Sequence, residues 1–411
     1  MRRALLVLVI LSLVSSVSVA CGPKATPTPT PVPEPTATPV PEPIKIGATV
    51  SLTGKYADSG KYYEQAYRLW EEEVNAGGGL LGRPIEMTIY DDKSDPDTGV
   101  SLYEKLITVD KVDLILGPYT SSVIYPVSGV AEKYKMLFLQ GGGNSPKLFE
   151  RGFKYMFLTL PGLAADFPRM MMRFLESLPE AERPQSSAVL FLDNEAMVAE
   201  AEGLKMELED LGIQVVYDEK VPEGVTDLTT TMAKVKESGA EVLFGHFFLP
   251  EGVLAVRAAK QLDYSPKAMW FSVGPAMIDW IETLEDDANY VWGSTMFLTK
   301  AKTPGLEEFA SSFQGKWDRP PDYHAAGAYA AAQVLQSAVE ASQSLDNDVL
   351  RDYVAANEFP TVIGTLSWDE TGKPEPAVLL IQWINGEQEI MWPPEAATTD
   401  PVYPMPAWAE R

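Results

Sequence analysis

Residues 112–144 read VDLILGPYTSSVIYPVSGVAEKYKMLFLQGGGN and give the clearest indication of the fold. Residues 112–116 form a short apolar run that predicts a buried β-strand, and residues 136–139 predict another. Between them, residues 121–134 predict a helix. A strand, a helix and a second strand in this order form a unit whose two strands lie parallel in one sheet.

The same alternation continues on both sides of this unit and restarts after Pro161 and Gly162. Strands are predicted at 44–50, 85–91, 187–192, 213–218, 242–245 and 268–271, and helices at 59–75, 98–108, 165–178, 196–211, 228–238 and 252–262. Alternation of this kind predicts parallel sheets covered by helices on both faces. Because it occurs twice, we expect an α/β protein with two doubly wound, Rossmann-like lobes.

The region after residue 297 lacks a full alternation and is therefore not predicted to be a third domain. Helices are expected at 306–317 and 323–341, and strands at 362–364 and 377–383 around a turn at 369–373. These segments are expected to return to both lobes. Residues 393–411 are rich in proline and are expected to form a tail with little order.

The N-terminus has the layout of a secretory signal over residues 1–20. Arg2 and Arg3 precede an apolar run at 4–14 that is shorter than the roughly 20 residues of a membrane span. The small residues before Cys21 resemble the lipobox of bacterial lipoproteins, although Ser18 stands where a leucine-like residue is usual. Lipidation is therefore expected at Cys21, and the protein is expected to be a membrane-anchored lipoprotein outside the cytoplasm.

The composition of the linker, the cysteine count and the net charge limit which structures and partners are expected. Residues 21–43 contain the lipidated cysteine and a linker in which proline alternates with small residues, which predicts an extended polyproline II tether. Cys21 is the only cysteine, so no disulfide can form within the chain. The net charge of −25 argues against binding of nucleic acid and against direct adhesion to anionic lipid.

A candidate binding site follows from the ends of the predicted strands, since ligands of open α/β sheets sit beyond the carboxyl ends of strands. After residues 112–116 the chain reads GPYTSS and enters a helix. The first free N–H groups of that helix, with the Ser121 and Ser122 hydroxyls, would form a cradle for a carboxylate beside Tyr119. The alternative is that both serines only cap the helix.

Two further loops are candidates. Gly142, Gly143 and Asn144 follow the next strand, and glycines allow backbone amides to approach a ligand closely; the alternative is a plain turn. In the second lobe, Phe247 and Phe248 follow a predicted strand and would stack on a ligand, unless they belong to the core. His246, before them, is expected to be a hydrogen-bonded structural histidine.

Four segments together resemble the leucine/isoleucine/valine-binding proteins, the type I solute-binding subunits of ABC transporters. They are IKIG with SLTG at 44–54, NAGGGLLGRPI running into YDD and DP at 75–96, ILGP with TSS at 115–122, and TVIGTLSWDETG at 361–372. The resemblance covers residues 44–392 and implies two lobes joined by three hinge crossings. It implies one lobe at 44–161 plus 297–365 and another at 162–296 plus 366–392.

The resemblance also implies roles for individual residues. It places a carboxylate-binding serine at Ser121, and it places Gly143 and Asn144 where the family contacts the ligand backbone. Ser59 and Met197 stand where well-known members carry tyrosines. VGPA at 273–276 stands where those members have a glutamate that pairs with the ligand ammonium. Another acid, such as Asp193, would then supply the countercharge, or the ligand lacks an α-amino group.

The remaining motifs favour binding over catalysis. The sequence has two histidines, His246 and His324, and no metal-ligand, P-loop or nucleophile-elbow motif, so we expect no enzyme activity, cofactor or metal site. The aspartates at 91, 92, 95 and 97 fit turns and a helix cap better than a cation site. The resemblance implies capture of a branched-chain amino acid, or of an aromatic or aliphatic carboxylate or amide, for a permease and its ATPase. A sensor or scaffold ectodomain is the alternative, and an extracytoplasmic hydrolase is a weaker one.

Overall fold

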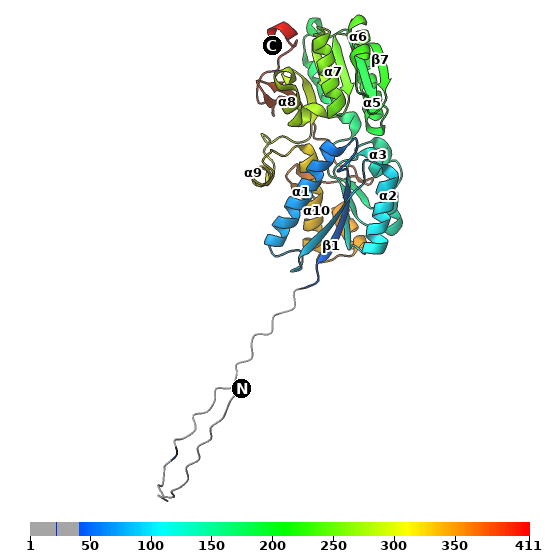
Figure 1. Ribbon diagram of the computed structural model, residues 1–411, viewed down its shortest axis with the longest axis vertical. Helices are drawn as coiled ribbons and strands as arrows, with labels where there is room; N and C mark the ends of the chain where they lie inside the picture. The colour runs from blue at the N-terminus through cyan, green and yellow to red at the C-terminus, as the bar shows by residue number, and fades with distance from the viewer. Residues whose placement is uncertain (1–21, 23–40) are drawn as a thin grey trace, which may run out of the picture. The chain divides into compact units, whose positions relative to one another are not determined.

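The computed structural model describes Gly22 and residues 41–411, and residues 41–411 form one unit (Figure 1). The expected signal peptide at 1–20, the lipidation site at Cys21 and residues 23–40 of the linker lie outside the described residues. Among the helices of the described part, none is long and apolar enough to cross a bilayer.

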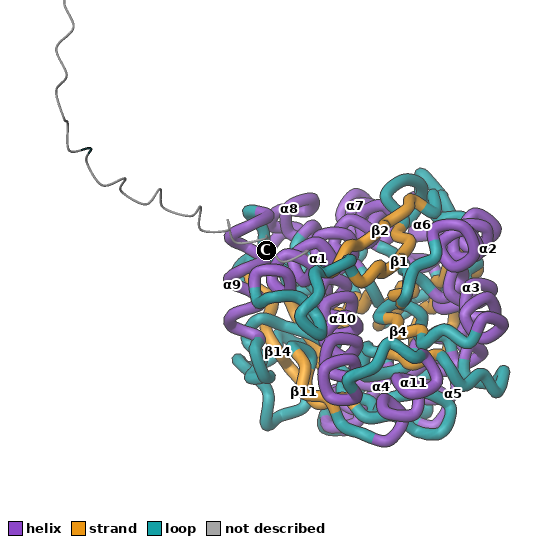
Figure 2. The backbone as a smooth tube through the Cα atoms, turned by 90° about the horizontal axis from the view of Figure 1, so that it is seen from below, coloured by secondary structure: helices purple, strands orange, loops and turns teal. Residues whose placement is uncertain are grey.

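The first lobe is built on a five-stranded parallel sheet in the order β2-β1-β3-β4-β5. Its strands are β1 (Ile44–Val50), β2 (Ile85–Asp91), β3 (Leu114–Leu116), β4 (Phe138–Gln140) and β5 (Met156–Leu158). Helices α1 (Ala57–Ala76) and α10 (Tyr323–Ser342) lie on one side of β1, and α2 (Pro96–Lys105) and α3 (Ser121–Tyr134) lie on the other (Figure 2). The strand order changes direction between β1 and β3, where open α/β sheets bind their ligands.

The second lobe is built on a seven-stranded sheet in the order β14-β13-β10-β9-β8-β6-β7. The strands are β6 (Ser186–Leu192), β7 (Gln214–Val221), β8 (Val242–His246), β9 (Ala268–Phe271), β10 (Trp292–Thr295), β13 (Leu379–Ile384) and β14 (Glu387–Trp392). The helices are α4 (Arg169–Ser177), α5 (Glu195–Asp210), α6 (Thr229–Glu237), α7 (Leu249–Gln261) and α8 (Asp279–Leu284). The strands β6 to β10 pair in parallel, whereas β13 and β14 form an antiparallel hairpin at one edge. The predicted α/β fold with two doubly wound lobes is confirmed.

The chain passes between the two sheets three times, as the resemblance implied. The first passage lies between β5 and β6, and the second leads from β10 into α9 (Leu306–Trp317) and α10. Helix α11 (Asn347–Ala356) packs against α10 and is followed by a small hairpin of β11 (Phe359–Thr361) and β12 (Gly364–Leu366). The third passage leads from β12 to β13.

Two predictions for the C-terminal third are wrong. Of the expected strand at 362–364, residues 362 and 363 form the turn of the β11–β12 hairpin, and Gly364, which begins β12, has a φ of 125°. The β-branched residues of that turn imitate a strand pattern. Residues 393–411 pack against the second lobe: Met405 is buried, and Trp408 Nε1 donates to the Tyr264 carbonyl at 2.9 Å. Proline only extends this backbone, whereas the apolar side chains between the prolines anchor it.

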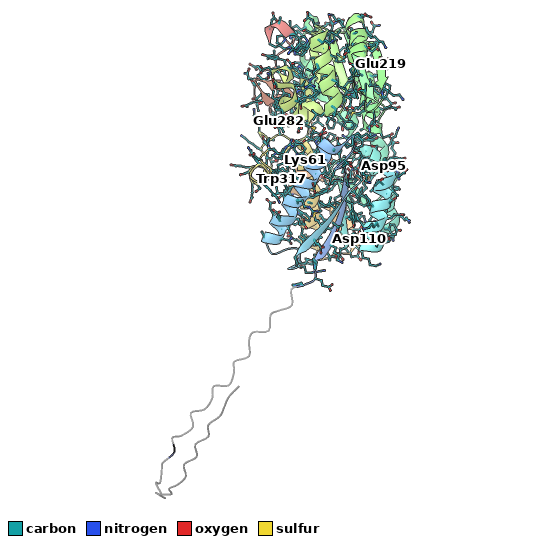
Figure 3. All side chains as sticks on the ribbon, viewed as in Figure 1. Lys61, Asp95, Asp110, Glu219, Glu282 and Trp317 are labelled. Carbon is teal, nitrogen blue, oxygen red and sulfur yellow. The ribbon has the colours of Figure 1, made fainter. Side chains whose placement is uncertain are left out.

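The aspartates near the start of α2 have structural roles. The Asp95 carboxylate accepts the Thr98 backbone N–H at 2.8 Å and caps α2, which confirms the expected helix cap (Figure 3). Asp92 is buried and accepts the hydroxyls of Thr49 at 2.9 Å and Ser51 at 2.6 Å. These bonds tie the end of β1 to the end of β2 beneath the first lobe's binding edge.

Candidate ligand-binding site between the lobes

A cavity lies between the two lobes at the carboxyl ends of their strands. Its volume is about 20 Å³, which is room for about one water molecule. It is lined from the first lobe and α10 by Tyr119, Thr120, Gly142, Asn144, Leu160 and Tyr323, and from the second lobe by Phe167, Ala196, Met197, Glu200, Phe248 and Val273. Because both lobes line this cavity, a ligand inside it would touch both at once.

The loop between β3 and α3 forms part of the first lobe's wall. Thr120, just before α3, has a φ of 99°, a conformation that a β-branched residue rarely adopts. Its carbonyl accepts the N–H groups of Val123 at 3.1 Å and Ile124 at 2.9 Å, which holds the residue in place. Backbone strain of this kind is typical of ligand sites.

The two predicted serine hydroxyls do not line the cavity. The Ser121 hydroxyl accepts the backbone N–H groups of Asn144 and Ser145, both at 3.1 Å, and the Ser122 hydroxyl lies 3.1 Å from the Tyr56 phenol. Both hydroxyls therefore bond neighbouring segments of the protein. The geometry does not show them in the expected position to bind a ligand carboxylate. The backbone N–H groups of Ser121 and Ser122, the first two of α3, directly follow the cavity-lining Thr120 and precede the first N–H group that bonds back to its carbonyl.

The glycine loop is organised by a residue that the sequence analysis did not single out. Gln140 Oε1 accepts the N–H groups of Gly142 at 3.0 Å and Gly143 at 2.6 Å, so these amides are already engaged. Gly142 lines the cavity, whereas a Cβ on Gly143 would lie 2.8 Å from Ile124 and would face the lobe interior. Gln140 is a polar residue at the end of an otherwise apolar strand, and this contrast in the sequence could have identified it as a residue that organises the loop.

Aromatic rings form much of the cavity wall. Tyr119 and Tyr323 come from the first lobe, and Phe248 comes from the second, with its ring centroid 6.5 Å from that of Tyr119. Phe248 lies in the cavity as expected, but Phe247 is fully buried and stacks on Phe271 in the core. Consecutive side chains after a strand point in different directions, so only one of the two phenylalanines reaches the cavity.

Two further predicted residues lie near the lobe boundary. Met197 lines the cavity, as expected. Ser59 is buried in α1 beside the Tyr119 phenol and does not line the cavity.

The structure does not place Asp193, the predicted countercharge, in the cavity. Its side chain is 59% exposed, and its carboxylate lies 3.1 Å from the Lys220 ammonium at the surface. The acid in the cavity is instead Glu200, which is buried and comes three residues after Met197 on α5. Residues three apart share one face of a helix, so this spacing was the signal that would have identified Glu200.

Glu200 forms a buried pair with His246. Glu200 Oε2 lies 3.1 Å from His246 Nδ1, and both side chains are almost completely inaccessible to solvent. Burial raises the pKa of Glu200 well above its ordinary value of 4.5 and lowers the pKa of His246 from 6.5 to about 3. The pair therefore holds one proton, on Glu200, and carries no net charge. His246 is a buried, hydrogen-bonded histidine, as expected.

This pair predicts a specific pH dependence of stability. Between pH 4.5 and 6.5 the unfolded pair also holds one proton, on histidine, so stability does not change with pH there. Above pH 6.5 the unfolded pair loses this proton, and stability falls with rising pH for as long as the folded Glu200 keeps its own, by at most about 1.4 kcal/mol per pH unit. In Glu200→Gln this decline disappears. Urea unfolding of both proteins between pH 5.5 and 8.5 measures the difference, and parallel curves would contradict it.

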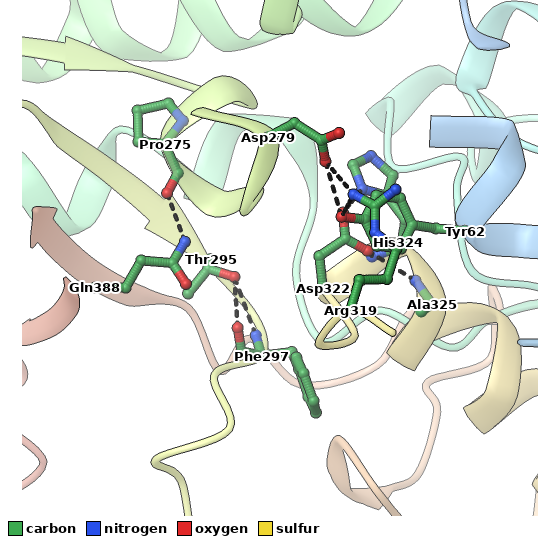
Figure 4. Close-up of polar contacts among 10 residues, drawn as sticks. All are labelled: Tyr62, Pro275, Asp279, Thr295, Phe297, Arg319, Asp322, His324, Ala325 and Gln388. Carbon is green, nitrogen blue, oxygen red and sulfur yellow. Dashed lines mark hydrogen bonds and ion pairs between the residues drawn. The ribbon is translucent and has the colours of Figure 1, made fainter. Parts of the chain in front are cut away.

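A second hollow, of about 180 Å³, lies between the second passage and the β13–β14 hairpin, and Figure 4 shows polar contacts near it. Its Asp322 carboxylate already accepts the N–H groups of His324 at 2.9 Å and Ala325 at 3.0 Å. The Gln388 amide donates to the Pro275 carbonyl at 2.7 Å. Because these polar groups bond within the protein, the smaller cavity between the sheets is the stronger candidate site.

The two lobes enclose a cavity between them and are connected by three passages of the chain. This arrangement defines a hinged binding protein. Residues 43–388 match the model of the periplasmic binding protein family, and the chain belongs to that family. This finding confirms the resemblance.

Individual relatives agree with this assignment. The chain is 27% identical to the leucine-, isoleucine-, valine-, threonine- and alanine-binding protein of Pseudomonas aeruginosa, over 80% of this chain and 86% of that protein. Its fold matches the branched-chain amino acid transporter substrate binding protein LivJ of Streptococcus pneumoniae in complex with isoleucine (TM-score 0.78, 20% identity, 86% of this chain and 100% of that one). It also matches a solute binding protein of an R. palustris ABC transporter in complex with benzoate (TM-score 0.75, 17% identity, 85% and 95%).

Proposed function

We propose that the protein is the substrate-binding subunit of an ABC transporter, which captures a small carboxylate between its lobes and delivers it to a permease. The observation that supports this most is the cavity at the carboxyl ends of both sheets, lined by residues of both lobes. A branched-chain amino acid is our first candidate ligand. An aromatic carboxylate is the second, because Tyr119, Phe248 and Tyr323 line the cavity.

We further propose lobe boundaries at 44–161 plus 297–365 and at 162–296 plus 366–392, with residues 393–411 attached to the second lobe. The permease and ATPase are proposed partners, and binding without catalysis is the proposed activity. The lipid anchor at Cys21, on residues outside those described, would hold this body outside the cytoplasm.

Contacts across the cleft support a cycle of opening and closing. The Tyr56 phenol of the first lobe accepts from Asn194 Nδ2 at 3.0 Å and donates to Glu223 Oε1 at 3.1 Å, both in the second lobe. On the other side, Asp279 of α8 bonds Tyr62 and Arg319 of the first lobe (Figure 4). Because the closed cavity is smaller than any amino acid, the lobes must separate to admit a ligand. The ligand then shifts the population of open and closed forms.

A ligand screen tests the proposed function. Thermal unfolding with leucine, isoleucine, valine, phenylalanine and benzoate is expected to show stabilisation by at least one of them, of about 2.7 kcal/mol at a hundred times its Kd. Small-angle scattering with the same ligand is expected to show contraction.

The matched variants are Phe248→Ala, in the cavity, and Met206→Ala, which is 66% exposed on α5. The first is expected to weaken binding and the second to leave it unchanged. Absence of any response across a wider set of amino and organic acids would contradict the proposal.

A further inference from the structure

Among the described residues that line the cavity, Glu200 alone carries a carboxylate. The residue is only 2% exposed, so its side chain is removed from bulk water. It projects from α5 in the second lobe together with Ala196 and Met197. A buried acid is costly unless it is neutral or meets a cation, and acids of this kind occur mainly at functional sites.

The protein itself supplies no cation to Glu200. Its partner His246, on β8, is neutral because burial lowers its pKa to about 3. The other ring nitrogen of His246, Nε2, is buried and has no hydrogen-bond partner among the described residues. No acceptor is therefore present there to stabilise a protonated, positively charged ring. Val273, which follows β9 and also lines the cavity, is apolar. The second lobe therefore offers one acid whose countercharge must come from elsewhere.

The opposite wall of the cavity, in the first lobe, favours a negatively charged group. There Thr120 leads directly into the N-terminus of α3, a helix of 14 residues, where unpaired N–H groups and the helix dipole favour an anion. A molecule with a carboxylate toward the first lobe and an ammonium toward the second would match both walls. Its ammonium would also link the lobes and favour the closed form.

We propose that Glu200 receives the ammonium group of the ligand and makes the cavity selective for α-amino acids over carboxylic acids that lack an amino group. This inference rests on the proposed function and assigns the countercharge to a helix residue. Glu200 gives up its proton when the ammonium arrives, and the resulting ion pair is enclosed between the lobes.

Two pairs of probes test the inference by calorimetry: leucine with 4-methylpentanoate, and phenylalanine with 3-phenylpropanoate. Members of a pair differ only in the amino group. The wild type is expected to bind an amino acid more tightly than its acid by about tenfold to a hundredfold, as for a charge-assisted hydrogen bond. Glu200→Gln is expected to lose this preference through weaker binding of the amino acid, while its affinity for the acid changes little.

Glu209→Gln is the matched control, since Glu209 is exposed on the same helix. It is expected to keep the wild-type preference. Titrations in buffers of different ionisation enthalpy add a second readout in the wild type, which is expected to release about one proton per amino acid bound. The titratable groups that face Glu200 or share its cavity are His246 on β8 and the phenols of Tyr119 and Tyr323, and Lys205 on α5 acts on the His246 ring.

Several outcomes would overturn the inference. One is a wild type that binds the acids, or benzoate, as tightly as the amino acids. Another is a Glu200→Gln protein that weakens both members of a pair equally, as a structural defect would. Absence of proton release would also overturn it, even if Glu200→Gln failed to fold. In each of these cases the protein still binds a small carboxylate and the proposed function stands. A wild type that binds none of the probes contradicts the proposed function itself.

Discussion

Replacing Asp279 by asparagine is expected to open the ligand-free protein. The Asp279 carboxylate, on α8 of the second lobe, accepts the Tyr62 hydroxyl at 2.8 Å and the Arg319 guanidinium at 2.6 Å, both from the first lobe. The side chains of Arg319 and Asp279 are 14% and 25% exposed, so water screens the pair only partly. Hydrogen bonds to charged groups contribute about 1.5–3 kcal/mol, so the ratio of closed to open protein should fall by about tenfold or more.

Small-angle scattering of ligand-free protein measures this change as a larger radius of gyration. Ligand affinity should fall together with the closed fraction, because binding must then also supply the free energy of closure. Asp287→Asn is the matched control: Asp287 pairs with Lys260 at 2.7 Å, and both residues belong to the second lobe. If Asp279→Asn and Asp287→Asn scatter alike and bind alike, the contact across the cleft does not hold the lobes together.

Replacing Gly60 by alanine is expected to destabilise the first lobe severely. A Cβ at this position of α1 would lie 2.0 Å from the Ser51 carbonyl oxygen and 2.6 Å from its carbon. Both are backbone atoms at the end of β1, so the clash cannot be relieved by turning a side chain. We expect a loss of about 3 kcal/mol or more, the upper range for overpacking. Because α1 carries Tyr62, which bonds Asp279 across the cleft, ligand binding should weaken as well.

Urea unfolding followed by tryptophan fluorescence measures the loss. Gly315→Ala is the control: Gly315 lies within α9, and a Cβ there would meet no atom within 4 Å. This variant should gain about 0.5–1 kcal/mol, since alanine favours a helix more than glycine does. Equal stability of the two variants would show that the end of β1 can move away from α1.

Much of the fold was predictable from local pattern. The alternation of apolar runs and helical stretches predicts both parallel sheets, because each element carries its own periodicity. The cap at Asp95 was predictable for the same reason, since it depends on neighbours three residues away. The sequence analysis did not predict β5, which is only three residues long, or α11, although Asp346 caps that helix.

The binding site was predictable only in outline. The loops that follow β3, β4 and β8 do line the cavity, because strand order brings the carboxyl ends together. Which side chains in those loops face it was not predictable. Ser121 bonds the glycine loop, Gly143 faces the lobe interior, and Phe247 enters the core.

The family resemblance implied the three connections between the lobes. The local alternation of strands and helices was enough to predict the two doubly wound lobes and the loops that line the cavity. These features depend on residues close together along the chain. Three features could be learned only from the folded chain: Asp193 pairs with Lys220 at the surface, Glu200 is the acid in the cavity, and Asp279 bonds across the cleft. Burial and countercharge depend on segments far apart in sequence, which meet within a folded lobe for Asp193 and Glu200 and across the cleft for Asp279.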